Sequence, residues 1–244
     1  MLMLTDMYHK VKEFFEINPE DKYGGFVDDD YYDDACMVLD DAVTNLSGHV
    51  ASGCTKAVFV PSNTNCMVLK VPFNANFYDN YEDENDESDP YIEPFRYANS
   101  NEVEIECWNY CERELFYYEK AVEDGFGMFF AETRFYGYTK KGYPLYLQEH
   151  AETFRQVSPE IKNAYSEKSY NSVQSKREIS DNYYLLDATW IAKAIDLYGE
   201  DLVERFLQYV NETPIGRDLH KSNYGYRTKD GAPVLIDWAG YYEE

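Results

Sequence analysis

The chain has 244 residues, which is enough for one domain of two lobes with a sizeable hydrophobic core. It carries 46 acidic and 22 basic side chains, a formal net charge of −24 at pH 7, so nucleic-acid phosphates and anionic membranes should repel it while basic partners are favoured. It contains no run of about 18 apolar residues, and the sequence therefore predicts no membrane span.

The first 46 residues form a predicted helical extension. Apolar side chains spaced three and four apart predict a helix over residues 3–17 and a shorter one over residues 35–46. Residues 1–15 mix Asp, His, Lys and Glu among the apolar positions, which is not the pattern of a secretory signal. Because the five cysteines also lack regular spacing, we expect the chain to lie in a reducing cytoplasm.

Residues 47–56 read S-G-H-V-A-S-G-C-T-K and are predicted to form a loop of small residues that includes Gly53. Such a loop lets backbone N–H groups approach phosphates closely. Two strands are predicted next, over residues 57–61 and 66–71. Lys70 lies centrally in the second strand among apolar neighbours, where an ammonium group needs an anion to meet.

An insertion is predicted at residues 77–94, where acidic side chains and two prolines favour a solvated loop. A long helix is then predicted over residues 101–121, with Glu104 on the same face as the apolar side chains. We therefore expect Glu104 to turn inward. The apolar residues of that face are Cys107, Trp108, Cys111, Leu115 and Tyr118. Three other acids of the helix remain alternatives to Glu104: Glu106, Glu112 and Glu114.

The middle of the chain alternates well enough to predict strands over residues 128–138 and 145–148. Residues 153–181 are polar and Ser-rich, and we expect them to be irregular with some helix. Apolar spacing then predicts helices over residues 184–198 and 200–211, separated by a glycine.

The last informative stretch combines a polar loop, a hairpin turn and a buried strand. Asp218 and Asn223 lie on the polar loop, and the Asp-Gly pair within residues 228–231 is typical of a tight hairpin. Residues 234–236 read as a buried strand that delivers Asp237 at its end. Two carboxylates and an amide at neighbouring loops can hold a divalent metal through oxygen atoms and leave one carboxylate as a base.

The sequence D-L-H-K-S-N at residues 218–223, followed by I-D-W-A-G at residues 236–240, resembles the catalytic and metal-binding loops of the protein-kinase superfamily. The D-L-H-x-x-N form is similar to that of aminoglycoside-phosphotransferase relatives and of small kinase-like proteins of tailed phages. The resemblance implies an α+β, bilobal protein-kinase-like fold with a β-rich N-lobe and a truncated helical C-lobe. It implies three regions: an extension at 1–46, an N-lobe at 47–148 and a C-lobe at 149–244.

The same resemblance implies ATP and Mg²⁺ as cofactors and assigns roles to individual residues. Lys70, held by Glu104, would neutralise the α and β phosphates. Asn223 and Asp237 would bind Mg²⁺, and Asp218 would accept the proton of an acceptor hydroxyl.

Four further residues receive supporting roles from the resemblance. Gly53 would lie in the phosphate loop, and Gln148 would lie at the connection between lobes, where backbone groups meet an adenine edge. Arg217 would orient the catalytic loop, and His220 would touch the γ phosphate or brace the catalytic carboxylate. The chain departs from the family pattern at Gly216, where a His often stands, and at Trp238, where a Phe often stands.

Together these features predict an ATP- and Mg²⁺-dependent phosphotransferase that acts on a hydroxyl of a protein or a small molecule. We expect it in the cytoplasm, which would be that of the host if a phage encodes it. Two alternatives stay open: a kinase-shaped binder without catalysis, and an acidic mimic of nucleic acid. Either one would capture a basic host protein, and its surface charge is the feature that favours it. The sequence does not indicate an oligomeric state.

Overall fold

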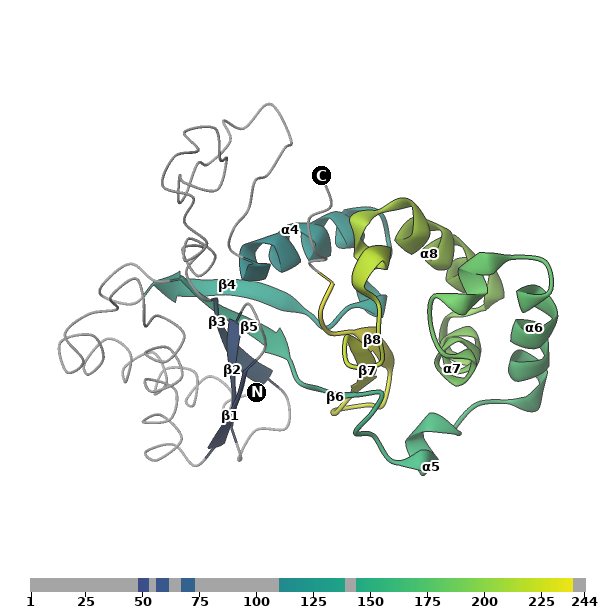
Figure 1. The fold of residues 1–244 in the computed structure, drawn as a ribbon, viewed down its shortest axis with the longest axis horizontal. Coiled ribbons are helices and arrows are strands. Elements are labelled where there is room, and N and C mark those ends of the chain that lie inside the picture. The colour runs from purple at the N-terminus through teal and green to yellow at the C-terminus, as the bar shows by residue number, and fades with distance from the viewer. Residues whose placement is uncertain (1–47, 53–55, 62–66, 73–109, 139–143, 239–244) are drawn as a thin grey trace, which may run out of the picture. The chain divides into compact units, whose positions relative to one another are not determined.

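The computed structural model of the chain describes residues 48–52, 56–61, 67–72, 110–138 and 144–238 (Figure 1). These residues form a mixed α+β protein with two antiparallel sheets, which confirms the predicted class. The chain divides into two compact units. The first unit is Met1–Leu115 with Thr133–Gln148, and the second is Phe116–Glu132 with Glu149–Glu244. The helices predicted at residues 3–17 and 35–46 and the acidic insertion at residues 77–94 lie outside the described residues.

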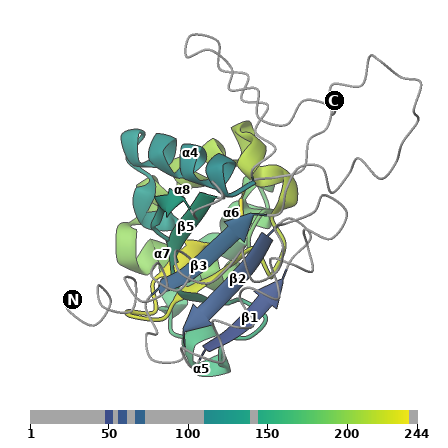
Figure 2. The same cartoon turned by 90° about the vertical axis from the view of Figure 1, so that its left-hand side faces the viewer.

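The sheet of the first unit has five strands in the order β1-β2-β3-β5-β4, and Figure 2 shows the first three side by side. Its strands are β1 (Gly48–Ser52), β2 (Lys56–Pro61), β3 (Met67–Pro72), β4 (Thr133–Tyr138) and β5 (Pro144–Glu149). Strands β2, β3 and β5 confirm the predicted strands to within one residue at each end. Alternating apolar residues bounded by turn residues specified them well.

The loop of small residues predicted at 47–56 is mostly wrong, because β1 takes up half of it. Gly48 pairs with Pro61 and Ser52 with Ala57, so this segment joins the sheet. A Cβ atom at Gly48 would lie 2.6 Å from the ring of Phe59, and the close approach of the two strands therefore requires glycine there.

Helix α4 (Tyr110–Glu123) confirms the described part of the helix predicted over residues 101–121. The helix ends at Glu123, and the chain turns away at Gly125, whose φ of 83° lies in the left-handed region. The amide of Phe126 then donates to the carbonyl of Ala121 at 2.7 Å. This is the usual way for a glycine to close a helix and satisfy its last carbonyls.

The strand predicted over residues 128–138 is wrong in its first half. Residues Gly127–Phe129 form a 3-10 helix (η4), and β4 begins only at Thr133. Between them, the amide of Ala131 donates to the carbonyl of Leu235 at 2.9 Å. Phe129 and Phe130 are buried in the core of the second unit, so packing decided the conformation of this aromatic segment.

The second unit is built from helices and a small sheet of order β6-β7-β8. Its helices are α5 (Pro159–Lys162), α6 (Glu167–Arg177), α7 (Ala188–Tyr198) and α8 (Glu200–Glu212). Its strands are β6 (Ala151–Thr153), β7 (Tyr224–Arg227) and β8 (Pro233–Leu235). Its described part also contains three short 3-10 helices: η4, η5 (Asp181–Tyr184) and η6 (Pro214–Asp218).

Helix α8 confirms the helix predicted over residues 200–211, whereas α7 begins four residues later than predicted. Residues 181–184 turn as a 3-10 helix, and the carboxylate of Asp187 accepts from the amide of Thr189 at 3.0 Å to start α7. The capping aspartate therefore sets the beginning of the helix. The polar region at residues 153–181 contains α5 and α6, in agreement with the expected partial helix.

The predicted hairpin near the end of the chain is confirmed. β7 and β8 pair antiparallel, and the turn between them places Gly231 at a φ of 69°. The amide of Ala232 donates to the Asp230 carboxylate at 3.0 Å, so both residues of the Asp-Gly pair contribute to the turn.

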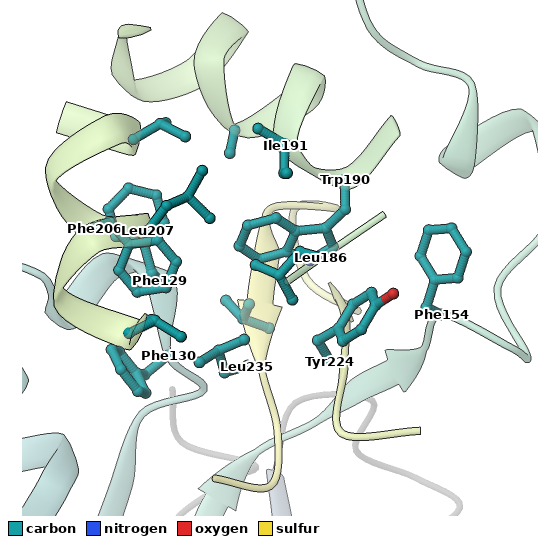
Figure 3. Close-up of a cluster of buried hydrophobic side chains, with 14 of the residues drawn as sticks. Phe129, Phe130, Phe154, Leu186, Trp190, Ile191, Phe206, Leu207, Tyr224 and Leu235 are labelled. Carbon is teal, nitrogen blue, oxygen red and sulfur yellow. The ribbon is translucent and has the colours of Figure 1, made fainter. Parts of the chain in front are cut away.

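An aromatic core holds the second unit together (Figure 3). The rings of Phe129 and Phe206 stack with centroids 4.0 Å apart, and Trp190 lies beside Phe206. Trp190 also donates its indole N–H to the carbonyl of Gly225 on β7 at 2.9 Å, which joins α7 to the sheet. Within the described part of the chain, no helix is long and apolar enough to cross a membrane.

Candidate functional site

Lys70 and Glu114 form a buried ion pair in the first unit. The Lys70 Nζ lies 2.7 Å from the Glu114 Oε2, and the exposed fractions of the two residues are 2% and 0%. Lys70 comes from the middle of β3 and Glu114 from the first half of α4. Direct contact between the two charges offsets the desolvation that each suffers inside the protein.

A second lysine meets the same carboxylate. Lys56, at the start of β2, donates from its Nζ to the Glu114 Oε1 and is only 5% exposed. Val58 pairs with Lys70 across the two strands, and Lys56 lies two residues before Val58. Since side chains alternate between the faces of a sheet, Lys56 and Lys70 share one face. The two oxygens of Glu114 thus hold one ammonium group each.

The carboxylate that contacts Lys70 among the described residues is Glu114, one of the alternatives, rather than the first choice. Glu104 lies outside the described residues, as does Gly53. Glu112 is partly buried, and burial raises the pKa of its carboxyl. Glu114 lies three residues after the buried Cys111 and four before Tyr118, so it fits the predicted apolar face as well as Glu104 does.

Gln148, which lies on β5, is the last residue of the first unit and is fully buried. Its Nε2 donates to the Thr133 Oγ1 at 3.0 Å, while its Oε1 is buried with no hydrogen-bond partner in the described part of the chain. The sequence placed Gln148 at the connection between lobes and expected backbone contacts there. The structure adds an inward-facing side chain, which the sequence did not predict.

The polar loop that carries Asp218 and Asn223 lies in the second unit. Asp218 is the last residue of η6, and a turn follows in which the amide of Asn223 donates to the carbonyl of His220 at 2.8 Å. His220 is exposed and accepts from the amide of Ser222 through its Nδ1 at 3.2 Å. Arg217, also exposed, precedes Asp218 on η6. The loop is therefore closed by its own hydrogen bonds.

The departure from the family pattern at Gly216 has a steric reason in this chain. A Cβ atom at this position would lie 2.6 Å from the carbonyl oxygen of Val210, near the end of α8. The 3-10 helix η6 therefore passes so close to α8 that a side chain such as histidine would force the two apart.

Asn223 and Asp237 are brought together by the backbone. The carbonyl of Asn223 accepts from the amides of Ile236 at 2.7 Å and of Asp237 at 3.1 Å. Asn223 is buried, and Asp237 is partly exposed two residues after the end of β8. The backbones of Asn223 and Asp237 are thus adjacent in the second unit.

Trp238, which follows Asp237, is fully buried. Its ring meets that of Phe130 edge to face, with centroids 5.0 Å apart. The residue that departs from the Phe of the family pattern is thus a core residue here, and it fixes the chain immediately after Asp237.

The hairpin is also tied to Glu149, the residue at which the chain returns to the second unit. The buried carboxylate of Glu149 lies 3.1 Å from the Arg227 Nε and 2.5 Å from the Lys229 Nζ, and it accepts from the amide of Glu132 at 3.1 Å. Two cations and one backbone amide thus make Glu149 a structural anchor for the strand that follows the polar loop.

The oxygen atoms of Asn223 and Asp237 fit the ligand preference of Mg²⁺. This ion takes one or two carboxylates together with waters and phosphates, and does not need a complete protein cage. The described residues contain no group of three or more His, Cys, Asp or Glu side chains placed to hold a metal.

Comparisons with known proteins give no match for this chain: no protein-family model, no curated protein and no solved structure resembles it significantly. The candidate residues therefore have to be judged on their own geometry. Lys70 and Glu114 belong to the first unit, and Asp218, Asn223 and Asp237 belong to the second.

Proposed function

We propose that this chain is a kinase-like phosphotransferase, which uses ATP and Mg²⁺ to transfer the γ-phosphate to a hydroxyl of a protein or a small molecule. In this proposal the overall fold is a bilobal, protein-kinase-like one. The first unit corresponds to the β-rich lobe and the second to the helical lobe.

The observation that carries the proposal is the buried pair of Lys70 and Glu114. A strand lysine held by a helix glutamate is the arrangement with which kinases position a cation at the α and β phosphates. Here the two side chains are 44 positions apart in sequence and meet at 2.7 Å inside the protein. An ion pair of this kind adds little stability compared with apolar packing, so a functional reason for it is favoured.

The second unit supplies the remaining groups. Asn223 and Asp237 present oxygen atoms from adjoining backbone segments and would hold Mg²⁺, which bridges phosphate oxygens and neutralises charge during transfer. Asp218, at the end of η6, would take the proton of the acceptor hydroxyl. His220 lies on the same loop, exposed to solvent, where it would meet the γ-phosphate.

The decisive experiment is transfer of labelled γ-phosphate from Mg·ATP, with the chain itself and a bacterial lysate as acceptors. We expect transfer by the wild type and a loss of about a hundredfold or more in Asp218→Asn, because the general base is removed. Binding of Mg·ATP should be nearly unchanged in that variant. Equal transfer by the two proteins would contradict the proposed role of Asp218.

A second function is favoured by the net charge of −24. In this alternative the kinase-like site holds nucleotide without transfer, and the acidic surface captures a basic protein, as a partner or as a mimic of nucleic acid. Retention of the partner should then weaken with salt and persist in Asp218→Asn. Competition by DNA for the same partner would distinguish the mimic from the simple binder.

A further inference from the structure

Two buried lysines share one buried carboxylate in the first unit, although the kinase-like site requires only one of them. Lys70 satisfies one oxygen of Glu114 at 2.7 Å, and Lys56 donates to the other. Because the two oxygens belong to one carboxylate, the two ammonium groups lie close enough to contact neighbouring phosphates of a single ligand.

The position of Lys56 in the sheet is determined by the strand register. Lys56 pairs with Pro72 and Val58 with Lys70, so the two lysines lie diagonally on the same face of adjacent antiparallel strands.

Packing alone does not explain a lysine at this position. Burying an ammonium group is costly, and an apolar side chain of similar volume commonly serves the interior as well or better. Lys56 is nevertheless buried, with its Nζ at the carboxylate that already contacts Lys70. A ligand with several negative charges would benefit from both cations.

The negative charge of the whole chain also favours a site with more than one lysine. At −24, the protein repels a nucleotide triphosphate at long range, so the binding site must provide its cations locally. Inside the protein, where the dielectric is low, two lysines next to each other attract a triphosphate much more strongly than exposed ones would.

We propose that Lys56 is a second phosphate-binding residue, which contacts the phosphates of the bound nucleotide together with Lys70. This inference rests on the proposed function, since it names a further residue of the same nucleotide site. It predicts that Lys56 discriminates between ligands by their phosphate groups, with no effect on the nucleoside part.

The test is calorimetric titration of the full chain with Mg·ATP and with adenosine. Loss of one charge-assisted contact in Lys56→Met should weaken Mg·ATP binding about tenfold, while adenosine binding stays within about twofold of the wild type. Lys70→Met should behave in the same way. The matched control is Lys176→Met, which removes one surface lysine that pairs with Glu204 at 2.8 Å and should change neither affinity.

The remaining outcomes distinguish a failure of the role of Lys56 from a failure of the proposed function. If Lys56→Met weakens Mg·ATP and adenosine by the same factor, or weakens neither, Lys56 has a structural role and this inference is wrong while the proposed function stands. If the wild type binds neither ligand, the proposed function itself fails. Should Lys56→Met not fold, Lys56→Gln, which keeps a hydrogen-bond donor for Glu114, is held to the same expectation.

Discussion

The buried residues described in the two units differ in their charge. In the first unit, two lysines and a glutamate lie among the buried residues of the sheet and of α4. In the second unit, the core is a cluster of aromatic and aliphatic side chains around Phe129, Trp190 and Phe206. Apolar packing stabilises a fold on its own, whereas buried charges do so only when each has a partner.

This difference indicates where stability and function reside. The second unit holds its polar loop on a rigid aromatic base, so substitutions in that base should act through stability. The first unit contains charges that contribute little to stability as a set, so substitutions there should separate stability from ligand binding.

The largest expected effect is on the aromatic base. Phe206 is fully buried, stacks on Phe129 and meets Phe126, Phe130 and Trp190. Phe206→Ala should lower the free energy of unfolding by about 4 kcal/mol, because it leaves a large cavity. Chemical denaturation of the wild type and variant measures this directly. Phe206→Leu, which keeps most of the volume, should cost less than half as much, and equal costs would contradict the packing argument.

A somewhat smaller effect is expected when the charges of the first unit are unbalanced. Glu114→Gln removes the carboxylate that faces Lys56 and Lys70 and should cost about 3 kcal/mol of unfolding free energy. The reason is that the two buried ammonium groups lose the negative charge of Glu114, which offsets the cost of their desolvation. Glu204→Gln, which breaks an exposed pair with Lys176, should cost about 0.5 kcal/mol or less.

The control for the charge argument replaces all three groups at once. A variant with methionine at Lys56 and Lys70 and leucine at Glu114 should regain most of the stability that Glu114→Gln loses, since no buried charge remains. The same variant should bind no Mg·ATP. A triple variant less stable than Glu114→Gln would show that the charges are needed for the fold itself.

A further effect is expected at alkaline pH and belongs to the second unit. Burial raises the pKa of Tyr183, Tyr209 and Tyr224 from 10.0 to about 12 each. The folded state therefore favours the protonated phenols, and their contribution to stability, complete below about pH 10, is lost as the pH rises towards 12. Denaturation at a series of pH values should show stability falling in this window. Tyr183→Phe should make the fall shallower, and an unchanged slope would contradict it.

Much of the fold could be predicted from local patterns. The Asp230-Gly231 turn and the strands around it depend on residues close together in sequence, and the same is true of β2, β3 and α8. Short-range preferences for turns and for alternating or helical spacing are sufficient in these places.

The errors occur where distant residues decide the conformation. Phe129 and Phe130 are aromatic residues of the kind that favours strands. Contacts with Phe206 and Trp238 nevertheless hold them in the core, at the end of the 3-10 helix η4. The whole of β1 lies within the segment predicted as a loop, because its pairing with β2 is not visible in its small residues. Tertiary packing overrides propensity in both cases.

The candidate site was predicted unevenly for the same reason. Asn223 and Asp237 flank a hairpin, so sequence spacing was enough to bring them together. The partner of Lys70 depends on which part of α4 faces the sheet, and helical spacing alone did not choose between Glu104 and Glu114. Lys56 was read as the end of a loop, although its even spacing from Val58 could have placed it on the face of Lys70.

One carbonyl group in the second unit has a wider consequence. The carbonyl oxygen of Asn223 accepts hydrogen bonds from two amides of the segment that carries Asp237, so in the proposed function the two residues would act as a single chelating group. The entropy needed to order that group is lost when the chain folds, and little is left to lose when a cation arrives. A substitution that shifts either segment would misalign both oxygen ligands together, so affinity for the ion should be lost in one step.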